Sequence, residues 1–267
     1  MDDAIVSNPK APRVRRAAAL ARKRERQAQG RFLVEGPQAV RELLAHRPEL
    51  AEVVYASTGD EPWQHETGRL ASGAGVRVER ATDAVLTALS GTVSPQGVAA
   101  VARSWETPVA EALQGARLVA VLHEVRDPGN AGAVLRVADA AGADAVVFAG
   151  ESVDPFHPKV VRATTGSLFH LPVVVAGALG EVVDAAREAG LTTLAADVRG
   201  SDLIGARALL AGPVAWIFGN EARGLSAPDR ALADRSLRLP IYGAAESLNL
   251  ATAASVLIYE TAFAQNA

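Results

Sequence analysis

The feature that most constrains the fold of this 267-residue chain is a regular alternation of short apolar runs with segments of helical pattern. From residue 117 on, the apolar runs are LVAVLH, AVVFAG, LPVVVA, TTLAAD, VAWIFG and LRLPI, and a long helix over Ser247–Ala264 ends the pattern. Continuous apolar runs are typical of strands covered on both faces, and helices between them favour a parallel sheet. The sequence therefore predicts an α/β domain with a parallel sheet over residues 117–267.

A second, weaker alternation precedes this domain. The runs RFLVE, AEVVYA, VRVER and GVAAVA are separated by helical segments at Pro37–His46, Pro62–Ala71 and Thr82–Leu89. This pattern predicts a smaller α/β domain over residues 13–106, preceded by a flexible tail at 1–12 and followed by a linker at 107–116.

Basic residues are concentrated near the start of the chain. Nine of the 27 Lys and Arg residues lie between Lys10 and Arg31, with Glu25 as the one acid among them, although the whole chain has a net charge of −3. We expect one helix over Arg13–Gln29, ended by Gly30. A concentrated basic segment favours a phosphate-rich partner, and a merely solvated helix face is the alternative.

Several classes of protein are excluded by what the sequence lacks. With no cysteine there can be no disulfide, no thiolate nucleophile and no Cys-ligated metal, and the five histidines show no helical i, i+4 pairing, so no metal site is predicted. No apolar run reaches the ~18 residues of a membrane span, and the N-terminus lacks the apolar core of a signal peptide. We expect a cytoplasmic protein.

Three polar segments follow predicted strands, where ligands of open α/β sheets collect. In HEVRDPGNAGAVLR (123–136), we expect Asn130 to cap a helix over Asn130–Ala141 that carries Arg136. In WIFGNEARGLS (216–226), glycines surround Glu221 in a pattern that matches neither a dinucleotide fingerprint nor a P-loop.

The third segment, ESLNLATAAS (246–255), opens the terminal helix. We expect Ser247 to cap this helix, Asn249 to lie in its first turn, and the helix to be buried because it is apolar on nearly all sides. Taken singly, each of the three segments also fits an ordinary capped helix or glycine turn.

Together and in this order, DPGNxGAxxR, FGNExxGL and ESLNL resemble the signature motifs of the SpoU (TrmH) family of RNA ribose 2′-O-methyltransferases, in the SPOUT class. The resemblance covers about residues 117–262. The stretch GRFLVEGPQAVREL (30–43) is similar to that family's substrate-binding domain of the ribosomal-protein-L30e-like type. Two departures stand out, because Val137 follows Arg136 where Thr or Ser is frequent, and Ile241 and Tyr242 replace a Pro-Met-like run.

The resemblance implies a fold, a cofactor and a set of site residues. The second domain would be a SPOUT-type trefoil knot that binds S-adenosylmethionine, without metal, through backbone groups of Gly219, Leu239 and Leu248. The protein would be a homodimer. The polar active-site positions of the family correspond to Asn130, Arg136, Glu221, Ser247 and Asn249.

The chemistry requires a group that handles a proton, since a ribose 2′-hydroxyl must lose its proton as it attacks a methyl group. The family assigns this role to the arginine that matches Arg136, but an arginine with a pKa above ~12 is a reluctant base. We therefore expect Arg136 to grip the target phosphate and orient the hydroxyl, while the phosphate or a transiently neutral Arg136 takes the proton.

The substrate is predicted to be RNA, bound in part by Arg22, Lys23, Arg24 and Arg26 together with Arg136. Ribosomal RNA is the favoured substrate, because the first domain resembles a ribosomal-protein module. Transfer RNA and a non-catalytic RNA-binding factor of the same fold are the alternatives. The presence of all five polar site residues argues against a factor without activity.

Overall fold

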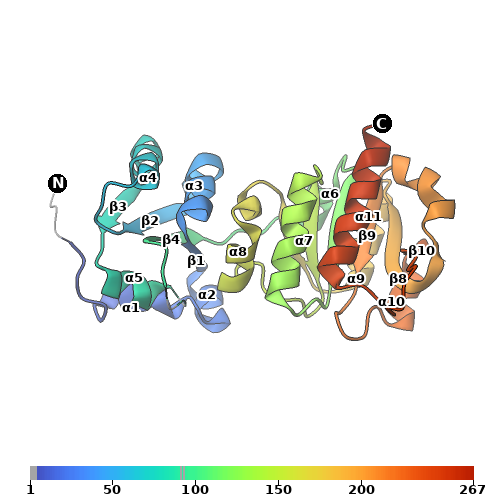
Figure 1. Cartoon of the computed structure of the whole chain (residues 1–267), viewed down its shortest axis with the longest axis horizontal. Helices are drawn as coiled ribbons and strands as arrows, with labels where there is room; N and C mark the ends of the chain where they lie inside the picture. Colours follow the sequence, from blue (N-terminus) through green and yellow to red (C-terminus); the bar gives the residue numbers. More distant parts are fainter. Residues whose placement is uncertain (1–4, 91, 93) are drawn as a thin grey trace. The chain divides into compact units, whose positions relative to one another are not determined.

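The computed structural model describes residues 5–90, 92 and 94–267, and the chain divides into two compact units (Figure 1). Unit 1 comprises Met1–Trp105 together with Phe156–His170, and unit 2 comprises Glu106–Pro155 together with Leu171–Ala267. Residues 1–4 of the predicted tail lie outside the described residues. From Ile5 on the tail is held, because buried Val6 donates its N–H to the carbonyl oxygen of Arg80 at 2.8 Å.

Unit 1 is built on a four-stranded mixed sheet of order β1-β4-β2-β3. Strand β4 is antiparallel to both β1 and β2, whereas β2 and β3 are parallel. The strands are β1 (Arg31–Glu35), β2 (Ala51–Ala56), β3 (Arg77–Arg80) and β4 (Val98–Arg103). All four strands were predicted from their apolar runs.

Helices cover the sheet of unit 1. They are α1 (Pro12–Ala19), α2 (Lys23–Gln29), α3 (Pro37–His46), α4 (Pro62–Gly73), α5 (Asp83–Leu89) and α8 (Pro158–Thr164), with 3-10 turns η1 (Pro48–Leu50) and η2 (Ser167–Phe169). Helices α1 and α5 pack side by side and share one hydrophobic core with the sheet, which includes Val14, Leu20 and Leu86.

The prediction of one helix over Arg13–Gln29 is wrong, because the chain breaks between α1 and α2. Leu20 is fully buried, and its carbonyl oxygen and that of Ala21 each accept a hydrogen bond at 3.0 Å from NH1 of Arg26. The last carbonyl groups of a helix lack hydrogen-bond donors within the helix, and the guanidinium of Arg26 donates to them here. Gly30 ends α2 at φ +60°, as predicted.

Residues 156–170 belong to unit 1, although the sequence places them within the second domain. The ring of Phe32 in β1 lies 4.7 Å from that of Phe156 and 6.4 Å from that of Phe169, measured between centroids. Trp105 packs edge-on against Phe156 in the same cluster. Burial of these rings ties the segment to β1, which no local pattern in the sequence indicates.

Unit 2 contains a six-stranded sheet of order β10-β8-β9-β5-β6-β7, and every neighbouring pair is parallel, as predicted. Its strands are β5 (Leu118–His123), β6 (Ala145–Ala149), β7 (Val173–Ala176), β8 (Thr192–Asp202), β9 (Val214–Phe218) and β10 (Arg235–Arg238). The central strands β5, β6 and β9 are buried at every position, which explains their continuous apolar sequences.

Helices cover both faces of this sheet. They are α6 (Val109–Leu113), α7 (Pro128–Ala140), α9 (Leu179–Glu188), α10 (Ala227–Leu232) and α11 (Leu250–Gln265), with the 3-10 segment η3 (Ile204–Ala211). Helices α7 and α11 lie side by side (Figure 1), and α6 and α10 pack against α9. The indole N–H of Trp216 in β9 donates to Oγ1 of Thr261 in α11 at 2.9 Å. Among the described residues, no helix is long and apolar enough to span a bilayer.

Both expected helix caps in unit 2 are corrected by the structure. Helix α7 begins at Pro128, and its N-cap is Asp127, whose side chain accepts the N–H of Asn130 at 2.8 Å. Helix α11 begins at Leu250, and its N-cap is Asn249 rather than Ser247. In each case the cap is the residue whose side-chain oxygen accepts N–H groups of the first helical turn. Several polar residues lie near each helix start, so the sequence alone left the position of the cap ambiguous.

Three further expectations for unit 2 need revision. The helical segment expected between TTLAAD and VAWIFG is the 3-10 segment η3, and the strand expected at LRLPI is Arg235–Arg238 instead. Helix α11 is only partly buried, since the side chains of Val256 and Phe263 are 41% and 64% exposed.

Candidate active site

The site begins with Glu221, which lies in the loop after β9. Its carboxylate accepts the backbone N–H groups of Arg126 at 3.1 Å and Asp127 at 2.9 Å. The same carboxylate accepts Nδ2 of Asn130, 91 positions away in the chain, at 3.3 Å. Glu221 therefore holds the turn that leads into α7.

Asn249 joins this network from the third segment. Its Nδ2 donates to Oδ1 of Asn130 at 3.0 Å, across 119 positions, and its own Oδ1 accepts the N–H groups of Ala251 and Thr252. Because Asn130 donates to Glu221 and accepts from Asn249, its amide is held in one orientation. The three polar segments of the sequence thus meet through Glu221, Asn130 and Asn249.

The loop after β9 is shaped by Asn220 and by two glycines. Nδ2 of Asn220 donates to the carbonyl oxygen of Glu124 at 2.9 Å, while its Oδ1 accepts the N–H of Ala222 at 3.1 Å. A Cβ atom on Gly219 would lie 2.5 Å from the carbonyl carbon of Gly224. Only glycine permits this approach of two backbone segments.

A cavity of about 360 Å³ opens beside this loop. Its walls include all three residues expected to hold the cofactor, Gly219, Leu239 and Leu248, together with Ser247 and Glu221. Its size falls within the range of pockets for small organic ligands, and its lining mixes leucines with a few polar groups, as such pockets do.

An acidic group that the sequence interpretation missed also lines the cavity. Asp197 in β8 accepts Nε and NH2 of Arg199 at 2.9 and 2.8 Å and NH1 of Arg230 at 3.3 Å. The hydrogen bond from Arg199 is the main reason why the pKa of Asp197 falls to about 2. The signal was present as DVR at the end of the run TTLAAD, but isolated acid–arginine pairs are too common to single out.

The remaining predicted residues are distributed over both units. Arg136 is exposed on α7, six positions after Asn130, and Ser247 is exposed at the cavity. Of the predicted RNA-binding residues in unit 1, Arg22, Lys23 and Arg24 are exposed, and Arg26 is not. At 3% exposure Arg26 is a structural residue, so its place in the RNA-binding set is corrected.

Comparisons with known proteins bear directly on this arrangement. The SpoU rRNA Methylase family matches residues 117–259, more than half of the chain, and the family of MRM3-like substrate binding domains matches residues 11–100. The chain belongs to the SpoU rRNA Methylase family. This membership confirms the family suggested by the three segments, the predicted fold class and the prediction of a methyltransferase.

Relatives of this SpoU methylase match along nearly the whole chain. The "23S rRNA (guanosine(2553)-2'-O)-methyltransferase RlmP" of Bacillus subtilis is 35% identical over 241 residues, which are 89% of this chain and 90% of RlmP. The AdoMet-bound rRNA methyltransferase from Sinorhizobium meliloti has 28% identity and a TM-score of 0.82, with 97% of each chain covered. The SpoU methyltransferase AviRb from Streptomyces viridochromogenes, in complex with AdoMet, has 29% identity and a TM-score of 0.81, covering 94% of this chain and 98% of AviRb.

Proposed function

We propose that this SpoU methylase transfers a methyl group from S-adenosylmethionine to a ribose 2′-hydroxyl of ribosomal RNA. The observation that carries the proposal is the hydrogen-bonded network of Glu221, Asn130 and Asn249. This network lies beside the cavity that Gly219, Leu239 and Leu248 line. Ribosomal RNA is preferred to transfer RNA because RlmP is named for 23S rRNA and the Sinorhizobium protein for rRNA. A cytoplasmic location is part of the same proposal.

The cavity residues suit the cofactor. Gly219 brings backbone rather than a side chain to the cavity wall, and Leu239 and Leu248 supply apolar surface. We assign these three residues to cofactor binding. When bound, S-adenosylmethionine supplies an electrophilic methyl group on a sulfonium.

The polar residues act on the RNA. Arg136 grips the phosphate next to the target ribose, for which a planar guanidinium offers two parallel donors. Asn130 and Asn249 orient the ribose or Arg136, Ser247 contributes a hydroxyl at the cavity, and Glu221 is a positioning residue that acts through Asn130. The proton of the 2′-hydroxyl passes to a phosphate oxygen, or to Arg136 after Arg136 has transiently lost its own proton to become neutral.

We assign RNA binding to unit 1 through the exposed cations Arg22, Lys23 and Arg24. Phosphate contacts of this kind position a protein on RNA without reading its sequence. The domain limits that go with this assignment are 13–106 for RNA binding and 117–267 for methyl transfer, with a linker at 107–116. Within these limits, residues 156–170 pack in unit 1, and α6 of the linker packs in unit 2.

A homodimer is part of the proposal and is supported by α11. Val256 and Phe263 are seven residues apart and therefore lie on the same face of the helix, where both are exposed. Large apolar side chains on one exposed face are typical of an interaction surface. Light scattering should give twice the chain mass for the protein and a lower mass for Phe263→Asp, with Val175→Asp, a similarly exposed apolar residue on β7, as the control.

A trefoil knot in unit 2 is proposed from the family resemblance. When the ends of unit 2 are pulled apart in an optical trap, a knotted chain stays shorter than the full contour length. Complete extension would contradict the knot.

The activity is tested with labelled S-adenosylmethionine and purified ribosomal and transfer RNA. We expect label on ribosomal RNA at a site resistant to alkaline cleavage, because a methylated 2′-oxygen cannot attack the neighbouring phosphate. Label on transfer RNA alone would favour that alternative substrate. RNA binding without transfer of label would favour a non-catalytic factor.

A further inference from the structure

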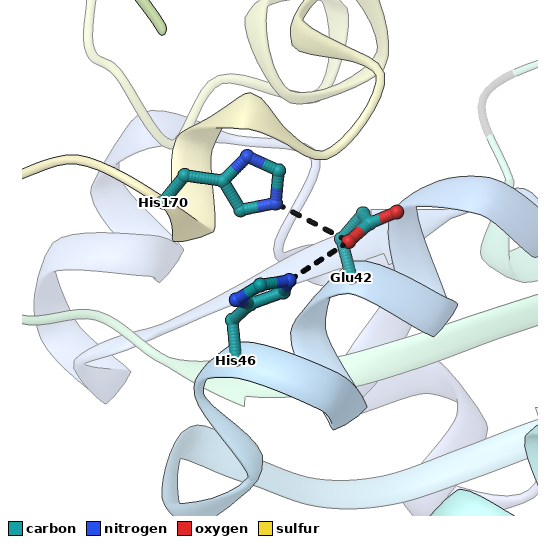
Figure 2. A group of neighbouring side chains, drawn as sticks. All are labelled: Glu42, His46 and His170. Carbon is teal, nitrogen blue, oxygen red and sulfur yellow. Dashed lines mark hydrogen bonds and ion pairs between the residues drawn. The ribbon is translucent and has the colours of Figure 1, made fainter. Parts of the chain in front are cut away.

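Unit 1 contains a group of three side chains that the proposed methyl transfer does not use. Glu42 and His46 lie one turn apart on α3, and His170 follows the 3-10 turn η2 (Figure 2). Oε2 of Glu42 lies 3.3 Å from Nε2 of His46 and 3.2 Å from Nε2 of His170. The two imidazole rings lie with their centroids 4.4 Å apart and their planes tilted by 57°.

These separations match those between the ligands of one metal ion. With metal–nitrogen and metal–oxygen bonds of ~2.0–2.1 Å in a tetrahedron, neighbouring ligand atoms are about 3.3–3.4 Å apart. The three donor atoms of Glu42, His46 and His170 all lie within 4.8 Å of one another. Small shifts of the imidazoles therefore suffice to place all three donors around one ion.

The carboxylate is fixed by its surroundings. Its other oxygen, Oε1, accepts Nε2 of Gln38 at 2.6 Å and NH2 of Arg41. The side chain of Glu42 also packs against Gly166, where a Cβ atom would collide with it. Partners that hold a ligand from its far side are typical of metal sites, and they leave Oε2 directed at the two histidines.

We propose that Glu42, His46 and His170 bind a zinc ion, which joins α3 to the segment that follows α8. Two imidazoles and one carboxylate form a donor set that zinc prefers, with a fourth position open to water. His46 is half exposed, so the ion can enter from solvent. Pairs of histidines at i, i+4 are absent from the sequence, which therefore predicted no metal site; here Glu42 and His46 form the i, i+4 pair, and His170 comes from 124 positions later in the chain.

The test uses full-length protein without a histidine tag, stripped with a chelator and then titrated with zinc against a chromophoric zinc indicator. We expect about one equivalent to bind, and His170→Gln and His46→Gln to weaken binding by about 10- to 100-fold or more, since even loss of an outer partner costs that much. His65→Gln is the matched control, because His65 is an exposed histidine of unit 1 that pairs with Asp60 instead.

A second measurement distinguishes zinc held by all three side chains from zinc bound weakly by the histidines alone. X-ray absorption at the zinc edge of the one-equivalent complex should show only nitrogen and oxygen neighbours, with the scattering pattern of two imidazoles. Circular dichroism in chelator should give the same fold for all variants. The proposal is overturned if the wild type binds no zinc near one equivalent, or if His65→Gln weakens binding as much as His170→Gln does.

Discussion

The two units use the same alternation of strands and helices but place their polar residues differently. In unit 2 all six strands are parallel, so their carboxyl ends share one edge, where the loops with Glu221 and Asn130 meet. In unit 1 strand β4 runs against both of its neighbours, and strand ends are divided between two edges. The polar groups of unit 1 lie on helices instead, as Glu42 and the exposed cations of α2 do.

This difference indicates that unit 2 is the catalytic unit. A parallel sheet gathers distant loops around one cavity, whereas a mixed sheet offers helix surfaces that suit recognition. We therefore expect changes in unit 2 to affect methyl transfer and cofactor binding. Changes to the exposed cations Arg22, Lys23 and Arg24 of unit 1 should affect RNA attraction alone.

The largest effect is expected for Arg136→Ala in unit 2. Loss of the guanidinium should lower single-turnover methyl transfer by about 10²–10⁴-fold while the affinity for S-adenosylmethionine stays within a few-fold. Arg136→Lys should also be poor, because an ammonium lacks the planar fork. If Arg136→Ala transfers methyl groups at the rate of the wild type, Arg136 does not have the role proposed for it.

The close approach of Gly219 to Gly224 predicts that a side chain at position 219 disturbs the cavity loop. The Cβ atom of Gly219→Ala would push on Gly224, so we expect destabilisation by about 1–3 kcal/mol and weaker cofactor binding. Gly205→Ala is the matched control, because Gly205 has open space around its Cα and an ordinary backbone. Calorimetric titration with S-adenosylmethionine distinguishes the two, and equal affinities would show that the loop tolerates a side chain.

Asp197, which lines the cavity, predicts that the free energy of unfolding depends on pH. Because the pKa of Asp197 falls from 3.8 to about 2 on folding, its charge stabilises the folded state above pH 3.8 and loses this effect as the pH falls toward 2. The shift corresponds to about 2 kcal/mol. Thermal unfolding of the wild type and Asp197→Asn should differ most near neutral pH and converge near pH 2. A constant difference over this range would contradict the assignment.

The smallest effect is expected for unit 1. Replacing Arg22, Lys23 and Arg24 by Ala should weaken RNA binding and reduce the log–log salt slope by up to about 2–3, since each phosphate contact contributes 0.7–0.9. Cofactor affinity should not change. Arg26→Ala, by contrast, should destabilise unit 1 with little change in slope, because Arg26 is buried. Equal slopes for the wild type and the triple variant would show that the basic segment is only a solvated face.

Much of the architecture could be predicted locally. Buried strands such as β5 and β9 are continuous apolar runs, so their type and their succession along the chain follow from the residues themselves. Helix boundaries were less certain, because Asp127 competes with Asn130, and Asn249 with Ser247, as the N-cap. The break after Ala19 is stabilised by the side chain of Arg26, six positions after Leu20, and helix propensity alone does not indicate it.

The sequence by itself determined the fold class, the family and the polar residues of the candidate site, because strand and helix periodicity and short motifs are properties of neighbouring residues. Only the tertiary structure decided that Glu221, Asn130 and Asn249 form one network, that Asp197 shares its cavity, and that residues 156–170 join unit 1. It also brought His170 to Glu42 and His46. Contacts between residues about a hundred positions apart depend on how strands are ordered in a sheet and which rings are buried together, and no local pattern encodes either.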